Sequence, residues 1–333
     1  MSADLRSFSD KYFVRASEIL AQDRHDPHVL MQIFCRRQAM LCGVQETLSL
    51  LQDLPEAFTV HGLNDGDSVE PWETVLTIEG PYRAFAHMET IYLGVLARGT
   101  RVATQTRDIV KVAGAKPVLF FGGRHDHYLT QEADGYAALL AGASGVATDA
   151  QGLRRDVQGV GTVPHALIAA YGGDTVLASQ KFVQFMPKDI PFVALVDFDN
   201  DCAGTAVKVA DALGDRLAGV RLDTSSSLVD LSLQAEPNPE YGVNPSLVFK
   251  VRQALDAVGH GNVEIVVSGG LTVERIKLFE AAQAPVNAYG VGSSILRNAG
   301  DFDFTADIVQ VDGQPVSKVG RELKPNPRLK LLS

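Results

Sequence analysis

The sequence is poor in cysteine and has no long apolar run. Its three cysteines, Cys35, Cys42 and Cys202, are too few and too scattered for a disulfide framework or a closed zinc site, and we expect reduced thiols. No segment approaches the roughly 18 uninterrupted apolar residues that a membrane span requires. The polar start, Met1–Arg6, lacks the apolar core of a signal peptide. We therefore expect a cytoplasmic protein that does not bind a membrane.

Positive charge is also scarce. The 333 residues contain 30 lysines and arginines against 40 aspartates and glutamates, which gives a formal net charge of -10. A nucleic-acid partner requires a basic surface that neutralises phosphates, and no lysine-rich run is present. We therefore expect no nucleic-acid partner, and any anionic substrate must be met by cations placed locally.

Several catalytic signatures are missing as well. The sequence has neither a Gly-x-Ser-x-Gly elbow nor a Walker loop. A Schiff-base enzyme needs a lysine that projects from a strand, whereas Lys208, Lys250 and Lys277 fall in predicted helices. These absences disfavour a serine hydrolase of that type, a Walker-type nucleotidase and an aldolase.

A repeated pattern is present instead, in which six or seven apolar segments each run into a short polar tip. The tips are residues 120–125, 146–149, 161–165, 195–199, 220–224, 267–270 and 289–293. A barrel of parallel strands brings such tips together at one mouth, where the loops between strands and helices form the active site. The pattern therefore indicates an enzyme.

The first and last parts of the chain differ in pattern from the middle. Residues 1–112 predict an α+β domain, with a helix at Val29–Leu51, strands at Thr59–His61 and Trp72–Glu79, and a helix at His87–Thr104. Residues 301–333 alternate and then turn at Asp312 and Gly313. We expect this C-terminal extension to return to the first domain and pack on it.

Between these parts, residues 113–300 alternate predicted strands with predicted helices, which indicates a parallel sheet with right-handed crossovers. The expected helices are 132–143, 204–216, 245–258 and 272–282. The predicted fold is thus α/β: an irregular TIM-like β/α barrel with an N-terminal α+β sandwich domain.

The last two tips are candidates for phosphate binding. Ser268, Gly269 and Gly270 end one predicted strand, and Gly290–Ser293 end the next. The final strands of a TIM barrel commonly form a phosphate site from backbone N–H groups, and glycine lets the backbone approach a ligand closely. The alternative is that these glycines only make tight turns.

Charged residues follow two other strands. Asp197 and Asp199 lie just beyond one strand, and Arg221 and Asp223 share a face of the next because residues two apart are on the same side of a strand. The carboxylates can hold magnesium, position a ribose or stabilise a cation, and Arg221 can pair with an anionic ring substituent. The alternative is an internal ion pair of the barrel.

Two histidine-containing tips remain. Arg124, His125 and His127 form a cationic cluster, which could instead ligate a metal, although no matching further ligands are apparent. His165 follows Gly161–Pro164 and begins an apolar helix. It is suited to act as a nucleophile or an acid and base, or else as a helix cap.

Taken in order, these motifs resemble those of the nicotinate phosphoribosyltransferase family, part of the type II phosphoribosyltransferases that also include quinolinate and nicotinamide enzymes. The resemblance covers nearly the whole chain. The matching segments are Phe121–Arg124 (Phe-Gly-Gly-Arg), Gly161–His165 (Gly-Thr-Val-Pro-His), Val220–Thr224 (Val-Arg-Leu-Asp-Thr), Ser268–Leu271, Gly290–Ser293 and Asp312–Gly320.

The resemblance implies transfer of ribose 5-phosphate from phosphoribosyl pyrophosphate to the ring nitrogen of nicotinate, with magnesium and usually with ATP as co-substrate, in NAD biosynthesis. It also implies residue roles. The phosphate would be bound by Ser268, Gly269, Gly270, Gly290, Gly292 and Ser293. The pyridine substrate would be contacted by Arg124, Thr148, Arg221 and Thr224. Ribose, magnesium or the developing positive charge would be met by Asp197, Asp199 and Asp223, of which Asp197 and Asp199 are the candidate metal ligands.

Two further roles follow from the same resemblance. His165 matches the histidine that family members phosphorylate with ATP. Tyr12 resembles the aromatic residue that stacks on the substrate ring from a neighbouring subunit. The resemblance therefore implies a homodimer or a higher homo-oligomer with a shared active site.

The sequence departs from the family pattern after Asp223. It continues as Thr224–Ser227 where many relatives have Ser-Gly-Asp, so that one carboxylate of this loop is missing. Quinolinate is the nearest alternative acceptor, but its second carboxylate requires more cations, and the predicted strands carry no lysine. A catalytically silent homologue that binds pyridine nucleotides is the other alternative.

Overall fold

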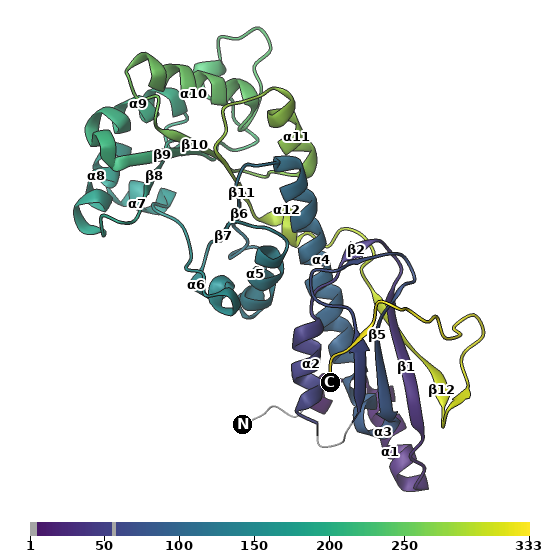
Figure 1. The fold of residues 1–333 in the computed structure, drawn as a ribbon. Coiled ribbons are helices and arrows are strands. Elements are labelled where there is room, and N and C mark those ends of the chain that lie inside the picture. Colours follow the sequence, from purple (N-terminus) through teal and green to yellow (C-terminus); the bar gives the residue numbers. More distant parts are fainter. Residues whose placement is uncertain (1–4, 55–57) are drawn as a thin grey trace. The chain divides into compact units, whose positions relative to one another are not determined.

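The computed structural model describes residues 5–54 and 58–333, which form two compact units. The first unit comprises the chain up to Thr104 together with Asn298–Ser333, and the second comprises Gln105–Arg297. Helix α4 (Glu89–Ala113) begins in the first unit and ends in the second. Each unit contains its own six-stranded sheet (Figure 1).

The sheet of the first unit is antiparallel and has the strand order β13-β12-β1-β5-β3-β14. Its strands are β1 (His28–Cys35), β3 (Thr59–Gly62), β5 (Thr74–Pro81), β12 (Phe304–Val311), β13 (Gln314–Pro315) and β14 (Lys330–Leu331). Two short strands, β2 (Ala39–Met40) and β4 (Ser68–Val69), pair separately. Because β12 pairs with β1 and β14 pairs with β3, the C-terminal extension returns to the first unit.

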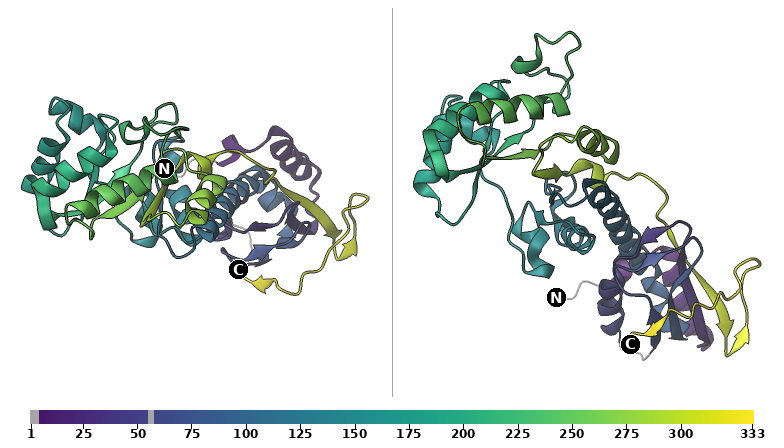
Figure 2. Two further views of the ribbon diagram at one scale, coloured as in Figure 1. Left: turned by 90° about the horizontal axis from the view of Figure 1, so that it is seen from above. Right: turned by 45° about the horizontal axis from the view of Figure 1, so that its top comes forward.

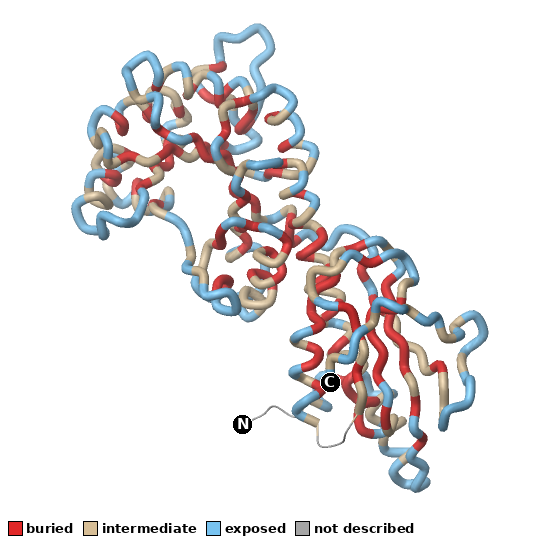
Figure 3. Tube along the Cα trace, viewed as in Figure 1, coloured by how far each residue is buried: buried red, intermediate tan, exposed pale blue. Residues whose placement is uncertain are grey.

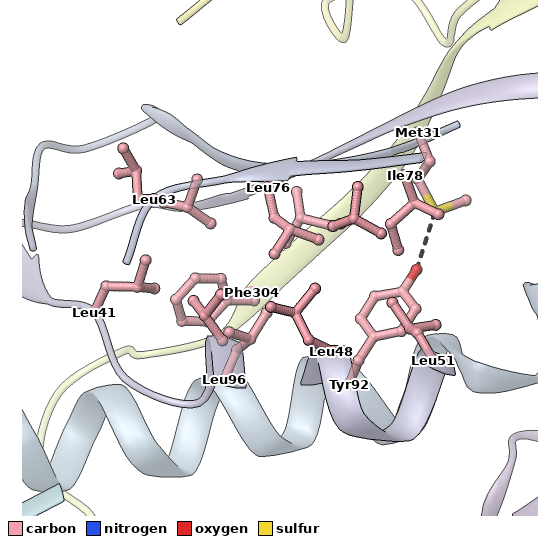
Figure 4. Packing of buried hydrophobic residues seen from close by; sticks show 14 of the residues in the cluster. Met31, Leu41, Leu48, Leu51, Leu63, Leu76, Ile78, Tyr92, Leu96 and Phe304 are labelled. Carbon is pink, nitrogen blue, oxygen red and sulfur yellow. Dashed lines mark hydrogen bonds between the residues drawn. The ribbon is translucent and has the colours of Figure 1, made fainter. Parts of the chain in front are cut away.

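The core of the first unit lies between this sheet and two helices. The helices of this unit are α1 (Lys11–Asp23), α2 (Val44–Gln52), α3 (Tyr82–Phe85) and the first part of α4. Figure 4 shows Leu76 and Ile78 of the sheet facing Leu48 of α2 and Leu96 of α4. Complete burial of such side chains stabilises a fold by about 1.5–3 kcal/mol each, so this apolar layer holds the unit together.

The opposite face of the sheet is covered by the C-terminal extension. Gln32 of β1 is only 2% exposed, its amide nitrogen donates to the carbonyl of Glu322 at 3.1 Å, and its amide oxygen accepts from the N–H of Lys324 at 3.0 Å. The predicted helix at 29–51 is therefore wrong over its first part, which forms β1 and β2, and correct only from Val44 onward, where α2 begins. Because both faces of β1 are covered, its residues lack the alternation that marks an exposed strand, and its apolar run was misread as helical.

The sheet of the second unit is parallel throughout, in the order β7-β6-β11-β10-β9-β8. Its strands are β6 (Val118–Phe120), β7 (Gly145–Val146), β8 (Phe192–Leu195), β9 (Leu217–Leu222), β10 (Glu264–Val267) and β11 (Ala288–Val291). The helices are α5 (Gln131–Leu140), α6 (Asp149–Gly152), α7 (His165–Ala170), α8 (Thr175–Phe185), α9 (Cys202–Leu213), α10 (Pro245–Ala257), α11 (Val273–Ala281) and α12 (Ser293–Leu296). The alternation of strands and helices is as predicted.

Helices α8, α9 and α10 lie side by side along the outer side of the strands (Figures 1 and 2). The strands they cover are buried, whereas the outer surfaces of the helices are exposed (Figure 3). Side chains such as Val220 and Ile265 are completely buried. The three cysteines are free and buried, as expected. Within the described residues, no helix is long and apolar enough to span a membrane.

In place of the predicted irregular TIM-like barrel, the strands form an open parallel sheet, whose edges are β7 and β8. An irregular segment, residues 159–162, bridges these edges. The N–H of Val160 donates to the carbonyl of Val146 of β7 at 2.7 Å, and the hydroxyl of Thr162 donates to the carbonyl of Val193 of β8. A regular strand is prevented here by Gly159, by Gly161, which has φ +153°, and by Pro164, which follows the segment. The result is a parallel half-barrel sheet with an irregular bridge.

Burial of Glu89 makes the stability of the first unit depend on pH. Desolvation, together with the nearby carboxylates of Asp307 and Asp10, raises the pKa of Glu89 to about 8. The native state therefore holds this proton more tightly than the unfolded state. The resulting stabilisation is complete below pH 4.5, is lost as the pH rises towards 8, and is on the order of 4 kcal/mol.

We predict that Glu89→Gln flattens this pH dependence, because glutamine carries no proton to lose. Thermal unfolding of both proteins, measured from about pH 5 to about pH 8, should show a smaller fall in melting temperature for the variant. Glu79→Gln removes an exposed carboxylate of β5 and is the matched control. An equal fall in all three proteins would contradict the assignment.

Candidate active site

A cavity of about 620 Å³ opens at the carboxyl ends of the parallel strands in the second unit. Six predicted tips contribute to its lining, because parallel strands all end at the same edge of their sheet. The predicted site residues that line the cavity are Arg124, Thr148, His165, Arg221, Asp223, Ser268, Gly269, Gly270, Gly290, Gly292 and Ser293. The structure therefore brings together most of the residues selected from the sequence.

The tips of β6 and β11 touch so closely that only glycine fits between them. A Cβ atom on Gly290 would lie 2.4 Å from the ring of Phe121, and one on Gly292 would lie 2.4 Å from the carbonyl oxygen of Phe121. The N–H of Phe121 in turn donates to the carbonyl of Val291 at 2.8 Å. Close packing of the two tips therefore accounts for both glycines.

The turn after β10 is held from behind by an arginine that sequence analysis missed. Arg275 of α11 donates from Nη1 to the carbonyls of Gly269 at 3.0 Å and Gly270 at 3.3 Å, and from Nη2 to the carbonyl of Val243 at 2.6 Å. Gly269 and Gly270 have φ values of +92° and +63°, which favour glycine. An arginine on a helix that bonds only to backbone carbonyls leaves no motif in the sequence.

Four amide N–H groups on these turns are unused. Across residues 5–54 and 58–333, the N–H groups of Gly269, Gly270, Gly292 and Ser293 have no hydrogen-bond acceptor. All four residues line the cavity. Unpaired N–H groups grouped around a cavity are suited to bind the oxygen atoms of a phosphate.

His165 and Asp197 form a hydrogen-bonded pair at the β8 edge of the sheet. His165 begins α7, and its Nε2 lies 2.9 Å from Oδ1 of Asp197, which follows β8. The Asp197 side chain is 7% exposed and that of His165 is 43% exposed. Burial raises the pKa of the Asp197 carboxyl, and the His165 ring opposes this rise. With Nε2 directed to the carboxylate, Nδ1 is the other ring nitrogen of His165, and an unprotonated imidazole nitrogen can act as a nucleophile.

Asp223 is fixed by its neighbours. Its Oδ1 accepts a hydrogen bond from the Ser268 hydroxyl at 2.7 Å, and its Oδ2 lies 3.9 Å from Nη2 of Arg221. Arg221, near the end of β9, and Asp223, just after this strand, both line the cavity, as expected for residues two apart. Among the residues that the structure describes, the buried Nε of Arg221 has no hydrogen-bond partner, so this guanidinium has unused hydrogen-bonding capacity. The Ser268 hydroxyl, by contrast, is committed to Asp223.

Ligand atoms of His165, Asp197 and Asp223 all lie within 4.8 Å of one another. The two carboxylate oxygens suit a hard divalent cation such as magnesium or manganese, whereas an imidazole nitrogen is not a ligand that magnesium prefers. Asp199, the other metal candidate from the sequence, is exposed and lies outside this group. The chain turns after Asp197, with Asn200 at φ +56°, so the two-residue alternation of the strand no longer applies there.

Two other predicted substrate contacts do not line the cavity. Thr224 is 3% exposed and its hydroxyl lies 3.4 Å from Sγ of Cys202, because the alternation that directs Asp223 to the cavity directs Thr224 to the core. Tyr12 belongs to α1 of the first unit and is 62% exposed. The stacking role of Tyr12 stays a prediction.

Two family models match consecutive parts of the chain. The N-terminal domain of quinolinate phosphoribosyl transferase matches residues 10–100, and the C-terminal domain of the same enzyme matches residues 102–307. The chain belongs to the quinolinate phosphoribosyl transferase family. The motifs in the sequence resemble those of the nicotinate branch of the type II phosphoribosyltransferases, whereas both family models are named after the quinolinate enzyme.

The similar proteins are named in two ways, as nicotinate-nucleotide pyrophosphorylase and as nicotinate phosphoribosyltransferase. A nicotinate-nucleotide pyrophosphorylase structure from Pyrococcus furiosus is 35% identical, with a TM-score of 0.86 over 98% of this chain and 81% of that one. A nicotinate phosphoribosyltransferase of Mycobacterium tuberculosis is 29% identical over 82% of this chain, and one of Bacillus subtilis is 30% identical over 71%. The chain spans 58% and 45% of the lengths of these two enzymes. The human nicotinic acid phosphoribosyltransferase shares the fold, with 18% identity and a TM-score of 0.73 over 93% of this chain and 76% of that one.

We predict that Gly292→Ala weakens anion binding at least tenfold, which corresponds to about 1.4 kcal/mol. The added methyl group would meet the carbonyl of Phe121 and the ring of His125, so the β6 and β11 tips must separate and displace the free N–H groups. Isothermal titration with phosphoribosyl pyrophosphate measures the effect. In the control Gly94→Ala, the new methyl group on α4 meets nothing within 4 Å. Unchanged binding by the Gly292 variant would rule out the proposed crowding at this turn.

Proposed function

We propose that this protein is a nicotinate phosphoribosyltransferase, which forms nicotinate mononucleotide and pyrophosphate from nicotinate and phosphoribosyl pyrophosphate in NAD biosynthesis. One observation carries the proposal: a single cavity combines four unpaired amide N–H groups, which suit a phosphate, with two arginines, which suit a carboxylate. Family membership and the curated names of the bacterial relatives support it.

The phosphate end of the substrate is bound by the turns after β10 and β11. The N–H groups of Gly269, Gly270, Gly292 and Ser293 surround the 5-phosphate, and the backbone of Gly290 lets the two turns approach. Arg275 keeps the first turn in place from the helix side. These donors are oriented before the substrate arrives, so little reorganisation is needed on binding.

The carboxylate of nicotinate is met by Arg124 and Arg221. Both line the cavity, and the buried, unpaired Nε of Arg221 offers a further donor. A guanidinium group can bind a carboxylate through two parallel hydrogen bonds, which orients the ring as well as holding it. The ring nitrogen is then directed towards C1 of the ribose.

Asp223 stabilises the positive charge that develops as the bond between C1 and pyrophosphate breaks. The Ser268 hydroxyl and Arg221 hold this carboxylate in place, so its charge acts on the transition state without first having to reorient. The residues that would hold magnesium are Asp197 and Asp223, whose carboxylate oxygens lie within 4.8 Å of each other. When bound, the ion would neutralise charge on the departing pyrophosphate.

His165 is the proposed site of ATP-dependent phosphorylation. Asp197 accepts a hydrogen bond from Nε2–H and so leaves the lone pair of Nδ1 free to attack the γ-phosphorus of ATP. The N–P bond forms as the bond to ADP breaks, and Asp197 stabilises the positive charge on the ring. Asp197 is largely buried, which keeps its carboxylate close to the His165 ring.

We extend the proposal to a homodimer or higher homo-oligomer with a shared active site. The exposed ring of Tyr12 on α1 is free to contact a substrate bound to a neighbouring subunit. Substitution of Tyr12 by alanine should then raise the KM for nicotinate more than the KM for phosphoribosyl pyrophosphate.

Quinolinate phosphoribosyl transfer is the second candidate function. It is favoured by the description of the family models and by the name of the 35% identical structure. The cationic residues of the cavity lining are Arg124 and Arg221, beside the histidines His125 and His165, with no lysine among the described residues that form it. Because quinolinate carries a second carboxylate that must be neutralised away from water, this small number of cations favours nicotinate.

We predict that purified protein with magnesium and phosphoribosyl pyrophosphate releases pyrophosphate when nicotinate is added, and that ATP increases the rate. Nicotinamide and quinolinate should give little release, because neither matches one carboxylate between two arginines. Release of both pyrophosphate and carbon dioxide with quinolinate alone would establish the second candidate instead. Binding without turnover of any acceptor would indicate a catalytically silent homologue.

We predict that His165→Ala abolishes the stimulation by ATP and leaves slow, ATP-independent transfer. His127→Ala is the matched control, since His127 is exposed and lies outside the cavity lining. Phosphate release from ATP and formation of nicotinate mononucleotide are measured in parallel for each protein. Undiminished ATP hydrolysis by the His165 variant would refute the phosphohistidine role.

A further inference from the structure

Gln131, the first residue of α5, connects two tips of the cavity without lining it. Its Nε2 donates to the carbonyl of Gly123 at 2.8 Å, and its Oε1 accepts from the hydroxyl of Thr148 at 2.8 Å. Gly123 belongs to the tip that carries Arg124, and Thr148 follows β7. Gln131 therefore fixes the position of the Gly123 tip relative to Thr148 in the cavity wall.

The direction of each hydrogen bond in this chain is fixed by chemistry. A backbone carbonyl can only accept, so the amide nitrogen of Gln131 must face Gly123. The amide oxygen then faces Thr148, and the Thr148 hydroxyl must donate to it. The same hydroxyl oxygen accepts from the N–H of Gln151 at 3.3 Å. Its proton and one lone pair are thus used, and only a lone pair remains for a ligand.

Thr148 has little freedom to change this arrangement. Oε1 of Gln151, a residue that is 1% exposed, accepts from the N–H groups of Ala147 at 3.0 Å and Thr148 at 3.3 Å. On the other side, the methyl group of Thr148 lies 3.0 Å from the position that a Cβ on Gly123 would occupy. Rotation of the side chain would break two hydrogen bonds and this packing. The hydrogen bonds of the Thr148 hydroxyl, a residue that lines the cavity, are therefore built into the fold.

An oxygen that can only accept is a poor neighbour for a carboxylate, which also only accepts. Two such groups facing one another away from water leave both unsatisfied and repel each other. A single carboxylate avoids this by binding to Arg124 and Arg221. A second carboxylate on the same ring, beside the tip that carries Arg124, would face the lone pair of Thr148.

We propose that Gln131 is a specificity-determining, positioning residue, which fixes Thr148 as a hydrogen-bond acceptor and thereby excludes pyridine dicarboxylates from the cavity. This inference deepens the proposed function and rests on it, since it assumes that the cavity binds a pyridine acid. It also changes the role expected for Thr148. Thr148 selects against a second carboxylate and does not bind the first one.

The test is the dissociation constant of quinolinate, measured by isothermal titration for wild-type protein and for Gln131→Met. Methionine has nearly the shape of glutamine but accepts no strong hydrogen bond, so the Thr148 proton is released and can be donated to a carboxylate. Quinolinate should bind at least tenfold more tightly to this variant, and nicotinate no more tightly than before. A residue with a merely structural role would not yield tighter binding when it is replaced.

Three companion variants show whether Gln131 acts through Thr148. Gln131→Glu keeps an acceptor opposite Thr148 and adds negative charge, so quinolinate binding should not improve. Thr148→Val removes the lone pair without offering a donor, and should give a smaller gain than Gln131→Met. The double variant Gln131→Met/Thr148→Val should bind quinolinate no better than Thr148→Val alone. Melting temperatures establish that each protein is folded. If Gln131→Met does not fold, tighter quinolinate binding by Thr148→Val than by Gln131→Glu supports the inference, and equal binding overturns it.

The outcomes separate this inference from the proposed function. Turnover of nicotinate by the wild type, with equal quinolinate affinity in wild type and Gln131→Met, overturns the inference alone. Turnover of quinolinate by the wild type overturns both, because the cavity then accepts a dicarboxylate with Thr148 intact. Turnover of neither acid overturns the proposed function, and the quinolinate affinities of the variants still decide the inference. Absence of binding of either acid to any variant overturns both.

Discussion

The polar groups of the cavity are gathered in one place because the six strands of the second unit run parallel to one another. Parallel strands all end at the same edge, so residues far apart in the sequence, from Arg124 to Ser293, meet there. The same constraint requires a helix after most strands, and those helices hold the tips from outside. Arg275 on α11 and Gln131 on α5 do so through hydrogen bonds to backbone carbonyls.

The close approach of neighbouring tips connects packing with chemistry. Gly290 and Gly292 allow the β11 tip to touch Phe121, and this contact draws the free N–H groups of Gly292 and Ser293 into the cavity. The carboxylates on the other strands are restrained differently. Asp223 is held by a hydroxyl and Asp197 by a histidine ring. The N–H groups suited to a phosphate and the restrained Asp223 carboxylate are therefore held on different turns of one cavity.

Much of this arrangement could be predicted from the sequence, because apolar runs that end in polar or glycine-rich tips are local patterns. The phosphate turns, His165 and the pair Arg221 and Asp223 were found in this way. Strand β1 was misread because the distant C-terminal extension covers it and removes its alternation. Asp199 and Thr224 were misplaced because their side-chain directions depend on where each strand ends. Arg275 was missed because its partners are backbone carbonyls, and Gln131 because it joins a backbone carbonyl to a hydroxyl 17 residues away, and neither leaves a mark in a sequence.

The central claim is that one cavity binds a phosphate through backbone N–H groups and a pyridine carboxylate through arginines. A crystal structure of the protein with nicotinate mononucleotide tests it most directly. The account predicts the phosphate within hydrogen-bonding distance of the N–H groups of Gly269, Gly270, Gly292 and Ser293, with the carboxylate at Arg124 and Arg221. A phosphate bound away from these turns, or a carboxylate directed to Thr148, would contradict it.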